Sequence, residues 1–334
     1  MPPVNLVVCP VCGKYNLITD TFRCMVCGRE HLCLRHYNEA ENCCGECAAE
    51  RARKREEEKR QKEEAERARQ EEERKRREAE QEAFLGNLDL NGVALKMIKV
   101  KAGRFQMGSP GNELGRWDDE TQHRVTLTKD FWLGATQVTQ GQWKAVMGNN
   151  PSCFQKGDDY LVEQVSWDDE MEFCEKLNQK YAAKLPSGYK FSLPTEAQWE
   201  YACRAGTTTA LNSGKNLTDE RTNCPNVNEV GWYDYEGKED STHPVAQKRP
   251  NAWGFYDMHG NVWEWCSDWY DEKYGCNDSD ATDPQGPSNG SDLVCRGGSW
   301  GRYARDCRAA YRGNFAPTLR SSFLGFRLAF VPVQ

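Results

Sequence analysis

The chain contains 334 residues, a length that predicts about two domains. Its formal net charge of −7 argues against a general nucleic-acid-binding protein, which would carry a basic face. No apolar run reaches the ~18 residues that span a bilayer, and the first residues lack the basic and apolar regions of a secretion signal. We therefore expect a cytoplasmic protein with no nucleic-acid ligand and no membrane span.

The 16 cysteines fall into two groups. Eight lie within the first 47 residues, mostly in CxxC pairs, and the other eight are scattered singly from Cys153 to Cys307. Disulfides are typical of small secreted proteins, whereas paired cysteines in a chain without a secretion signal indicate metal binding. We therefore expect bound metal in a reducing compartment.

Residues 1–47 contain four pairs of metal-binding side chains, with two residues between the members of each pair. Two such pairs complete one closed, tetrahedral zinc site. The eight ligands of two zinc ions are therefore Cys9, Cys12, Cys24, Cys27, Cys33, His36, Cys44 and Cys47. The spacing leaves open whether the sites are sequential or interleaved in a cross-brace, and Cys43 can replace Cys44. Because so short a segment lacks a core, zinc must supply much of its folding free energy. We expect it to dock a protein partner; a purely structural cap is the alternative.

Residues 48–83 consist only of Ala, Glu, Arg, Lys and Gln, all strong helix formers. Thirteen acidic residues balance thirteen basic ones, and opposite charges fall three and four positions apart, where they pair along a helix. No Leu, Ile or Val marks the seam of a coiled coil. The composition predicts a solvated single helix, about 54 Å long at ~1.5 Å per residue, that acts as a spacer. A partly disordered charged linker is the alternative.

Residues 84–334 predict an α+β domain with short strands, many turns and three helices. Residues 139–148 begin with a Thr cap and end at Gly, and residues 166–185 begin with a Ser cap followed by acidic residues. Residues 194–206 begin with Pro-Thr-Glu and end in Gly. The rest of the domain predicts an irregular architecture with much of its surface in ordered loops.

Several motifs of this domain occur in a recognisable order: "VKAGRFQMGS", "SLPTEAQWEYACRAGT", "GFYDMHGNVWEWCSDWY", "RGGSW" and "LGFRLAF". From Val93 to Phe330 the sequence resembles the formylglycine-generating-enzyme (sulfatase-modifying factor) domain family. The resemblance implies a C-type-lectin-like fold for nearly the whole large domain. It does not by itself imply the enzymatic activity, since one fold serves many functions.

The resemblance also implies a competing function, that of a cysteine- or metal-dependent oxidase. Formylglycine-generating enzymes hold copper on two cysteines just after the GGS motif. In this chain Gly301, Arg302 and Tyr303 follow "GGSW" directly, and Cys307 has no partner at the C-x4-C spacing. Because Cu(I) needs at least two thiolates aimed together, we expect a non-enzymatic protein without catalytic residues. A structural or chaperone-like accessory module is a third class.

Calcium is implied by the same resemblance at two places. The "GNVWEW" turn resembles one family site, with backbone carbonyls near Gly260 and Val262 and the carboxylate of Glu264. The region of Asn226 and Val227 resembles a second. Oxygen donors in a rigid turn suit Ca²⁺. The alternative is that Glu264 accepts hydrogen bonds from backbone amides of its own turn.

The segment from Arg296 to Arg327 alternates framework motifs with chemically diverse residues. Its pattern, RGGSW followed by CR, R, P, R and GFR at fixed spacings, resembles the variable region of proteins diversified by diversity-generating retroelements. Those systems mutate template adenines, and altered AAC or AAT codons cannot encode Lys, Glu, Gln, Met or Trp. None of these five occurs from Gly301 to Leu324, although they make up about a quarter of the residues between Phe84 and Trp300. The resemblance implies that this segment binds a ligand.

The segment divides into framework and presented residues. Trp300 and Ala304 are expected to hold the backbone by packing, Arg308 and Arg312 by polar contacts, and Pro317 by its fixed φ. The residues expected to contact a protein or other macromolecular ligand are Arg302, Tyr303, Arg305, Asp306, Tyr311, Asn314, Phe315, Leu319, Phe323 and Leu324. Tyr, Phe and Arg are common anchors of protein interfaces.

Overall fold

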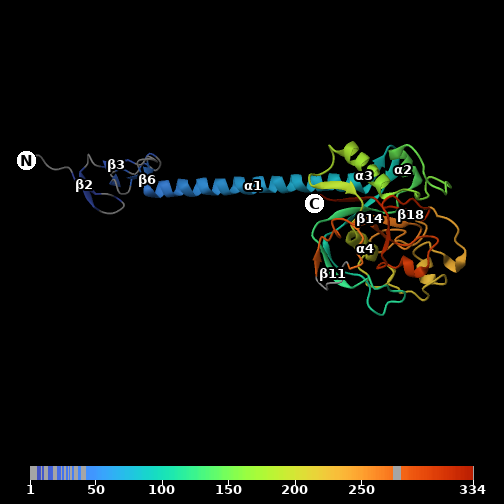
Figure 1. Cartoon of the computed structure of the whole chain (residues 1–334). Helices are drawn as coiled ribbons and strands as arrows, with labels where there is room; N and C mark the ends of the chain where they lie inside the picture. The colour runs from blue at the N-terminus through green and yellow to red at the C-terminus, as the bar shows by residue number, and fades with distance from the viewer. Residues whose placement is uncertain are drawn as a thin grey trace, which may run out of the picture. The chain divides into compact units, whose positions relative to one another are not determined.

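The structure is a computed structural model that describes residues 43–273 and 280–333, together with residues 6–8, 10, 14–17, 21–23, 25, 28, 30, 32–33 and 37–38. The chain divides into two compact units, Met1–Glu78 and Ala79–Gln334 (Figure 1). We refer to the second unit as the head. Within the described ranges, no helix is both long enough and apolar enough to cross a membrane.

The first unit contains three two-stranded antiparallel sheets and most of a long helix. The strand pairs are β1 (Leu6–Val8) with β2 (Tyr15–Leu17), β3 (Thr21–Phe22) with β4 (Leu32–Cys33), and β5 (Tyr37–Asn38) with β6 (Cys43–Cys44). Of the expected zinc ligands, the following lie outside the described residues: Cys9, Cys12, Cys24, Cys27 and His36. In the part of the chain that is described, no three His, Cys, Asp or Glu side chains gather as a metal site. The two-zinc site therefore stays a prediction.

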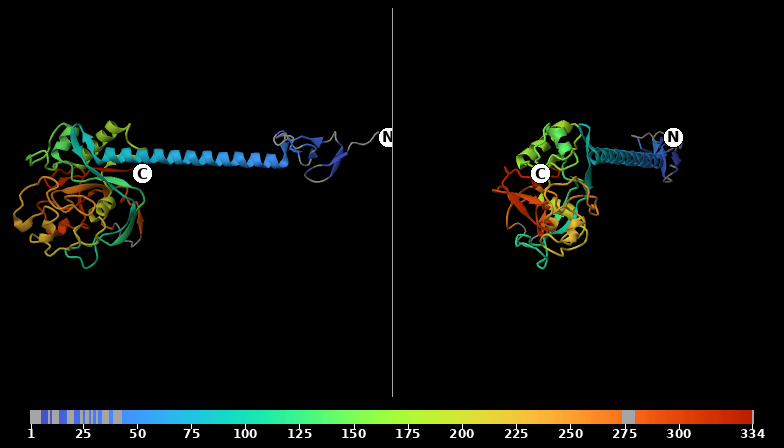
Figure 2. Two further views of the ribbon diagram at one scale, coloured as in Figure 1. Left: turned by 180° about the vertical axis from the view of Figure 1, so that it is seen from behind. Right: turned by 90° about the vertical axis from the view of Figure 1, so that its right-hand side faces the viewer.

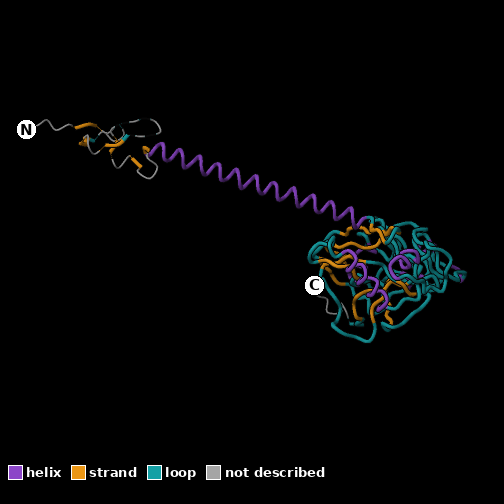
Figure 3. The backbone as a smooth tube through the Cα atoms, turned by 90° about the horizontal axis from the view of Figure 1, so that it is seen from above, coloured by secondary structure: helices purple, strands orange, loops and turns teal. Residues whose placement is uncertain are grey.

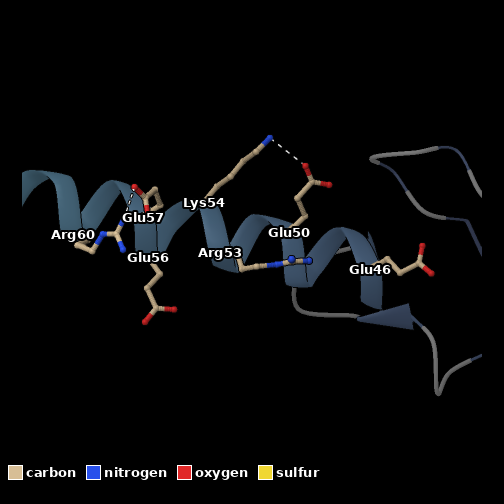
Figure 4. A pocket seen from close by; sticks show the side chains of 7 residues that line it. All are labelled: Glu46, Glu50, Arg53, Lys54, Glu56, Glu57 and Arg60. Atoms are coloured by element: carbon tan, nitrogen blue, oxygen red, sulfur yellow. Dashed lines mark hydrogen bonds and ion pairs between the residues drawn. The ribbon is translucent and has the colours of Figure 1, made fainter.

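Helix α1 (Gly45–Gly86) confirms the predicted charged helix and extends it by a few residues at each end. Its 42 residues correspond to about 63 Å at the usual helical rise. Figure 4 shows the side chains of the first turns, which point away from the helix in several directions and pair along it. Lys54 lies 3.4 Å from Glu50, and Arg60 lies 2.7 Å from Glu57. Such exposed pairs support an isolated helix, as expected of a spacer.

Apolar residues anchor the last turn of α1 in the head. Leu85 is buried, and the ring of Phe84 meets that of Tyr181 edge to face at a centroid distance of 5.3 Å. The chain then forms a small antiparallel sheet from β7 (Leu88–Leu90) and β8 (Val93–Leu95). The change from charged to apolar residues therefore marks the start of the folded head.

Three larger sheets form the body of the head, joined mostly by loops (Figure 3). The first has the order β13 (Tyr189–Ser192), β19 (Ala329–Pro332), β12 (Phe131–Gly134) and β9 (Met97–Val100). The second has the order β17 (Gly313–Phe315), β16 (Leu293–Arg296), β14 (Trp263–Trp269) and β18 (Leu324–Gly325). The third has the order β10 (Gly103–Met107), β11 (His123–Leu127) and β15 (Ala281–Thr282). The diverse segment leaves the second sheet at the end of β16, pairs with β16 again as β17, and ends in β18 beside β14.

The three predicted helices are confirmed: α2 (Gln140–Met147), α3 (Trp167–Tyr181) and α4 (Glu196–Arg204). Each begins with a capping box, in which Thr139, Ser166 or Thr195 accepts a hydrogen bond from the backbone N–H three residues later. Gly148 ends α2 with a φ of 81°, as its sequence position predicts, whereas α3 ends one turn earlier than predicted. A short helix, α5 (Pro225–Asn228), and two 3₁₀ turns, η3 (Tyr235–Gly237) and η4 (Ala304–Cys307), complete the head.

Aromatic side chains join the helices to the sheets. Trp143 of α2 stacks on Phe173 of α3 with ring centroids 5.5 Å apart, and Phe326 meets both rings edge-on. These two helices lie together on one side of the head (Figure 2). A second cluster surrounds Trp199 of α4, whose indole N–H donates to Glu264 at 2.6 Å. Phe326 belongs to the "GFR" motif, so this framework motif is part of the core.

Glu170 is a buried carboxyl group without a hydrogen-bond partner. It lies on α3, is fully buried, and neither carboxylate oxygen has a hydrogen-bond partner. Burial raises the pKa of Glu170 well above its usual 4.5, because the anion cannot be hydrated there. The folded chain keeps this proton at pH values where the unfolded chain loses it. The contribution of Glu170 to the stability of the head is therefore lost progressively as the pH rises above about 4.5.

Replacing Glu170 by methionine, which has a similar volume, is expected to raise the free energy of unfolding by about 1–3 kcal/mol at pH 8. It should also flatten the decline in that free energy between about pH 5 and pH 8, since the proton difference is removed. Urea unfolding at both pH values measures each effect. Glu172→Met, on the exposed side of the same helix, is the control and should leave the slope unchanged. An unchanged slope in Glu170→Met would contradict the argument.

Candidate binding face

Two glycines turn the diverse segment away from β16. Gly297 and Gly298 have φ values of 98° and 76°, which L side chains rarely adopt. A Cβ atom on Gly298 would also lie only 2.5 Å from Sγ of Cys307. The chain therefore needs glycine here to fold tightly against η4. This requirement explains the "GG" of the "RGGSW" motif.

Arg308 makes the fixed polar contacts predicted for a framework residue. Its guanidinium is buried and donates to both carboxylate oxygens of Glu120, at 2.6 and 2.7 Å, and to Glu113 at 2.8 Å. It also donates to the carbonyl of Gly115 at 2.6 Å. A buried guanidinium is tolerated only when it is paired in this way. Arg308 therefore ties the diverse segment to residues 110–120, which we call the 110–120 loop.

Arg312 and Arg296 fix the segment to α4. Arg312 donates to both carboxylate oxygens of Glu196, at 2.7 and 2.9 Å. Burial alone would raise the pKa of Glu196, but the two guanidinium groups hold it below its usual value. Arg296 pairs with Glu200 and donates to three consecutive backbone carbonyls, those of residues 309–311, at 2.5 to 2.8 Å. Arg296 therefore holds the backbone of the segment, whereas Arg312 ties the segment to α4 through its own side chain.

Further contacts of the segment are also made through backbone carbonyls. The indole N–H of Trp300 donates to the carbonyl of Ser322 at 3.1 Å. The carbonyl of Pro317 accepts the N–H of Trp167 at 3.1 Å, and Ala304 is buried, as expected of framework residues. Because backbone carbonyls are present in every residue, these contacts do not depend on which side chains the segment carries.

Eight of the ten residues predicted to contact a ligand are exposed or half-buried: Arg302, Tyr303, Arg305, Tyr311, Asn314, Phe315, Leu319 and Phe323. Tyr303 and Leu319 are 42% and 37% exposed. The guanidinium of Arg305 lies 5.4 Å from the ring of Tyr303, and that of Arg302 lies 5.7 Å from the ring of Phe323. Asn314 and Phe315 lie on β17, the edge strand of the second sheet. We call these eight residues the candidate binding face; Tyr311, Phe315 and Phe323 are partly buried and also pack against the core.

The prediction is wrong for the other two residues. Leu324 is 0% exposed, because β18 pairs with β14 and places this side chain in the apolar cluster that contains Trp143 and Phe173. Asp306 lies in η4, is nearly buried, and has its carboxylate 3.6 Å from Arg305. Burial raises the pKa of Asp306, as expected of a carboxyl group removed from water. Neither side chain is placed to contact a ligand.

The 110–120 loop contributes exposed apolar residues that sequence reasoning missed. Leu114 and Trp117 are 45% and 51% exposed, and the ring of Trp117 meets that of Tyr311 edge to face at 6.3 Å. No periodicity or motif in the sequence distinguishes these two residues. Only the tertiary contact between the loop and the diverse segment places them beside the candidate binding face.

The "GNVWEW" turn does not fit a calcium ion. The carbonyl oxygens of Gly260 and Val262 accept hydrogen bonds from the side-chain amide of Gln137, at 3.2 and 3.0 Å. Both carboxylate oxygens of Glu264 accept hydrogen bonds from Arg327, at 2.7 and 2.9 Å. The guanidinium neutralises the carboxylate that calcium would require, so these residues as arranged here do not fit the ion, and calcium at Gly260, Val262 and Glu264 stays a prediction. The alternative, in which Glu264 bonds amides of its own turn, is also replaced by this ion pair.

The second predicted calcium region coincides with α5. The side-chain amide of Asn226 donates to the carbonyl of Asn216 at 2.8 Å. The carbonyl of Val227 accepts the N–H groups of Val230 and Gly231, each at 2.9 Å. These contacts stabilise the turn from within the chain. Calcium at Asn226 and Val227 stays a prediction.

The thiol and imidazole groups near the segment are buried. Burial raises the pKa of the Cys295 and Cys307 thiols well above the usual range. Burial also lowers the pKa of His259 to about 4, so its imidazole is neutral. Its Nδ1 donates to the Cys307 carbonyl at 2.7 Å, and its Nε2 accepts the N–H of Asn212 at 3.0 Å. Thiolates are the reactive and metal-binding form of cysteine, so this environment favours structural roles.

Comparison with known proteins shows which family this chain resembles. The model of the sulfatase-modifying factor enzyme 1-like domain matches residues 90–331. Chaperone protein LppX of Paenibacillus barcinonensis is 32% identical over 234 residues, which cover 57% of this chain and 76% of LppX. The formylglycine-generating enzyme of Streptomyces coelicolor is 38% identical over 180 residues, which cover 50% of this chain and 52% of the enzyme. This chain thus spans about half the length of that enzyme.

Two solved structures share the fold of the head. Treponema denticola variable protein 1 is 32% identical with a TM-score of 0.63, and the match covers 73% of this chain and 97% of that protein. PvdO from Pseudomonas aeruginosa is 28% identical with a TM-score of 0.62 and the same coverage. These matches confirm the predicted α+β, C-type-lectin-like fold. The chain belongs to the sulfatase-modifying factor enzyme 1-like domain family.

Proposed function

We propose that this chain is a non-enzymatic recognition protein whose candidate binding face is diversified by a retroelement. The proposal rests on one observation, which is that residues 296–327 contain both buried framework residues and solvent-facing residues. Buried arginines hold the backbone of the segment, while most residues between them are exposed or half-buried. A rigid backbone with free side chains suits diversification, because it costs little ordering entropy when a ligand binds. The similarity to Treponema denticola variable protein 1 and the residue types missing from 301–324 support the proposal.

In this proposal the other parts of the chain connect the head to a partner in the cytoplasm. Residues 1–47 are a two-zinc adaptor that docks a protein, and α1 is a spacer. The self-pairing charges of α1 support the spacer role, since they keep a helix stable without a partner helix. A near-identical template repeat and a reverse-transcriptase gene beside this gene would be the genetic signature of diversification.

The face itself is tested by replacing Arg302, Tyr303 and Leu319 together with serine. Binding of a peptide selected by display against the wild-type full chain is expected to weaken by about 100-fold or more, because two or more interface anchors are lost. The melting temperature should stay nearly constant, since these side chains are exposed. Calorimetric titration and thermal unfolding measure the two effects. Lys101→Ser with Val333→Ser, two exposed positions just after β9 and β19, is the matched control. Unchanged peptide binding in the triple variant would refute the proposed binding face.

If residues 1–47 form the zinc adaptor, elemental analysis should find about two zinc ions per full-length chain, since four pairs of Cys and His side chains supply eight ligands. Cys24→Ser should lose about one zinc and leave the unfolding transition of the head unchanged. Cys153→Ser, an exposed cysteine of the head, is the control and should lose none. A wild-type content clearly below two zinc ions would contradict the adaptor.

The oxidase alternative rests on the similarity to formylglycine-generating enzymes. Two features argue against it: the missing C-x4-C pair after "GGSW", and the raised pKa of the buried Cys307 thiol. Cu(I) binding needs two thiolates, so a single buried cysteine that stays protonated is an unsuitable ligand for such a site. Formation of an aldehyde in a cysteine-containing peptide by the copper-loaded chain would restore the alternative.

A further inference from the structure

The 110–120 loop lies directly against the diverse segment. A Cβ atom on Gly115 would lie 2.7 Å from Cβ of Arg305, and the Gly115 carbonyl accepts a hydrogen bond from Arg308. The exposed Leu114 and Trp117 are therefore held beside the variable side chains by a buried ion-pair framework. Exposed large apolar residues of this kind are typical of interaction surfaces.

Two more constant segments border the candidate binding face. The carbonyl of Arg221 accepts the N–H of Ala304 at 2.8 Å, which places the exposed Arg221 next to the start of η4. On the other side, the ring of Phe154 meets that of Trp300 at 5.6 Å. The ammonium of the exposed Lys156 lies 5.6 Å from the Phe154 ring.

The charged groups of this border favour an acidic ligand. Arg116 pairs with Asp118 at 3.4 Å, but the Asp118 carboxylate is fully exposed. The ion pair is therefore weak, and a carboxylate of a ligand can replace Asp118 beside Arg116. The carboxylate of Asp219 accepts hydrogen bonds from the backbone N–H groups of Arg221 and Asn223. Lys156 and the variable Arg302 add further exposed cations. The exposed charges named here are three cations, Lys156, Arg221 and Arg302, against one carboxylate, Asp118, while Asp219 and Glu220 are half-buried. The solvent-facing charge of the border is therefore mainly positive, in a chain whose net charge is −7.

We propose that Leu114, Arg116, Trp117, Phe154, Lys156 and Arg221 form a constant rim that contacts every ligand of the face. The ligand that fits is a protein surface with carboxylates around an apolar centre. Trp and Arg are the residues that dominate protein interfaces, and guanidinium groups bind carboxylates bidentately. This inference rests on the proposed function. The rim supplies affinity common to all variants of the face, while the variable residues supply specificity.

The test uses the full-length chain and random 12-residue peptides selected by display. Selected peptides should be rich in Asp and Glu beside apolar residues, and their binding should weaken steeply as salt rises from about 50 to 500 mM. Trp117→Ala and Arg221→Ala should each weaken binding by about tenfold or more without changing the melting temperature. Val333→Ala, in the head, and Arg69→Ala, in the spacer, are the matched controls and should bind normally.

Each outcome separates this inference from the proposed function. If the triple serine variant loses binding while Trp117→Ala binds within about twofold of wild type, the rim is refuted and the diversified face stands. If neither variant changes peptide binding, the constant rim and the diversified face are both refuted. Selected peptides without acidic residues would refute the ligand class. Self-association in ultracentrifugation that Trp117→Ala abolishes would identify a second copy as the occupant and also overturn the inference.

Discussion

Replacing Arg327 by methionine is expected to lower the free energy of unfolding of the head by about 3–5 kcal/mol. The guanidinium is fully buried and donates two hydrogen bonds to Glu264 and one each to the carbonyls of Gly134 and Tyr256. Methionine fills most of the space but leaves Glu264 as a buried anion without a cation, with only the indole N–H of Trp199 donating to it, and leaves two carbonyls without this donor. Urea unfolding followed by tryptophan fluorescence measures the loss.

Two further variants separate the lost ion pair from lost packing. Arg327→Met combined with Glu264→Gln should recover part of the stability, since no unpaired charge remains in the core. Arg320→Met removes an ion pair with Asp169 whose arginine is half exposed, and should change the free energy of unfolding by about 1 kcal/mol or less. A loss below about 1 kcal/mol in Arg327→Met itself would show that the buried pair does not hold the "GFR" motif in place.

Leu324→Ala and Leu319→Ala are expected to differ strongly, although both residues lie in the diverse segment. Leu324→Ala should cost about 2–5 kcal/mol, because it opens a cavity in the core where β18 meets β14. Leu319→Ala should change the free energy of unfolding by about 0.5 kcal/mol or less, since its side chain is partly exposed. Chemical unfolding of both variants measures the difference.

The same pair of variants tests where the diversified residues end. Binding of a selected peptide should fall in Leu319→Ala and persist in whatever fraction of Leu324→Ala stays folded. Equal, small stability losses would mean that β18 is not part of the core. The boundary of the binding face would then lie beyond Phe323.

The framework explains how a segment can change its side chains without unfolding the head. Arg296 bonds three backbone carbonyls, Trp300 bonds the carbonyl of Ser322, and Gln164 donates its N–H to the carbonyl of Ser321 at 3.0 Å. A carbonyl is the same group whichever side chain its residue carries. Substitution at the exposed positions therefore leaves the buried network intact, which is the physical requirement for a diversified surface.

The sequence by itself determined the local elements of this protein and its family. Thr139, Ser166 and Thr195 mark three helix starts because a capping box needs only residues close in the chain. The uniform charge pattern of residues 48–83 predicts α1 for the same reason, since its stabilising pairs are three and four residues apart. The order of the motifs predicts the fold, which the comparisons confirm.

Only the tertiary structure decided which of these residues reach solvent and which partners they have. Leu319 and Leu324 look alike in the sequence, but strand pairing with β14 buries Leu324. Glu264 resembles a calcium ligand until Arg327, 63 residues away, is seen to occupy its carboxylate. Trp117 becomes a neighbour of Tyr311 because Arg308 binds the 110–120 loop through Glu113, which lies 195 residues earlier in the chain. Such long-range pairs leave no periodic trace in the sequence, because burial and ion pairing depend on which segments meet in space.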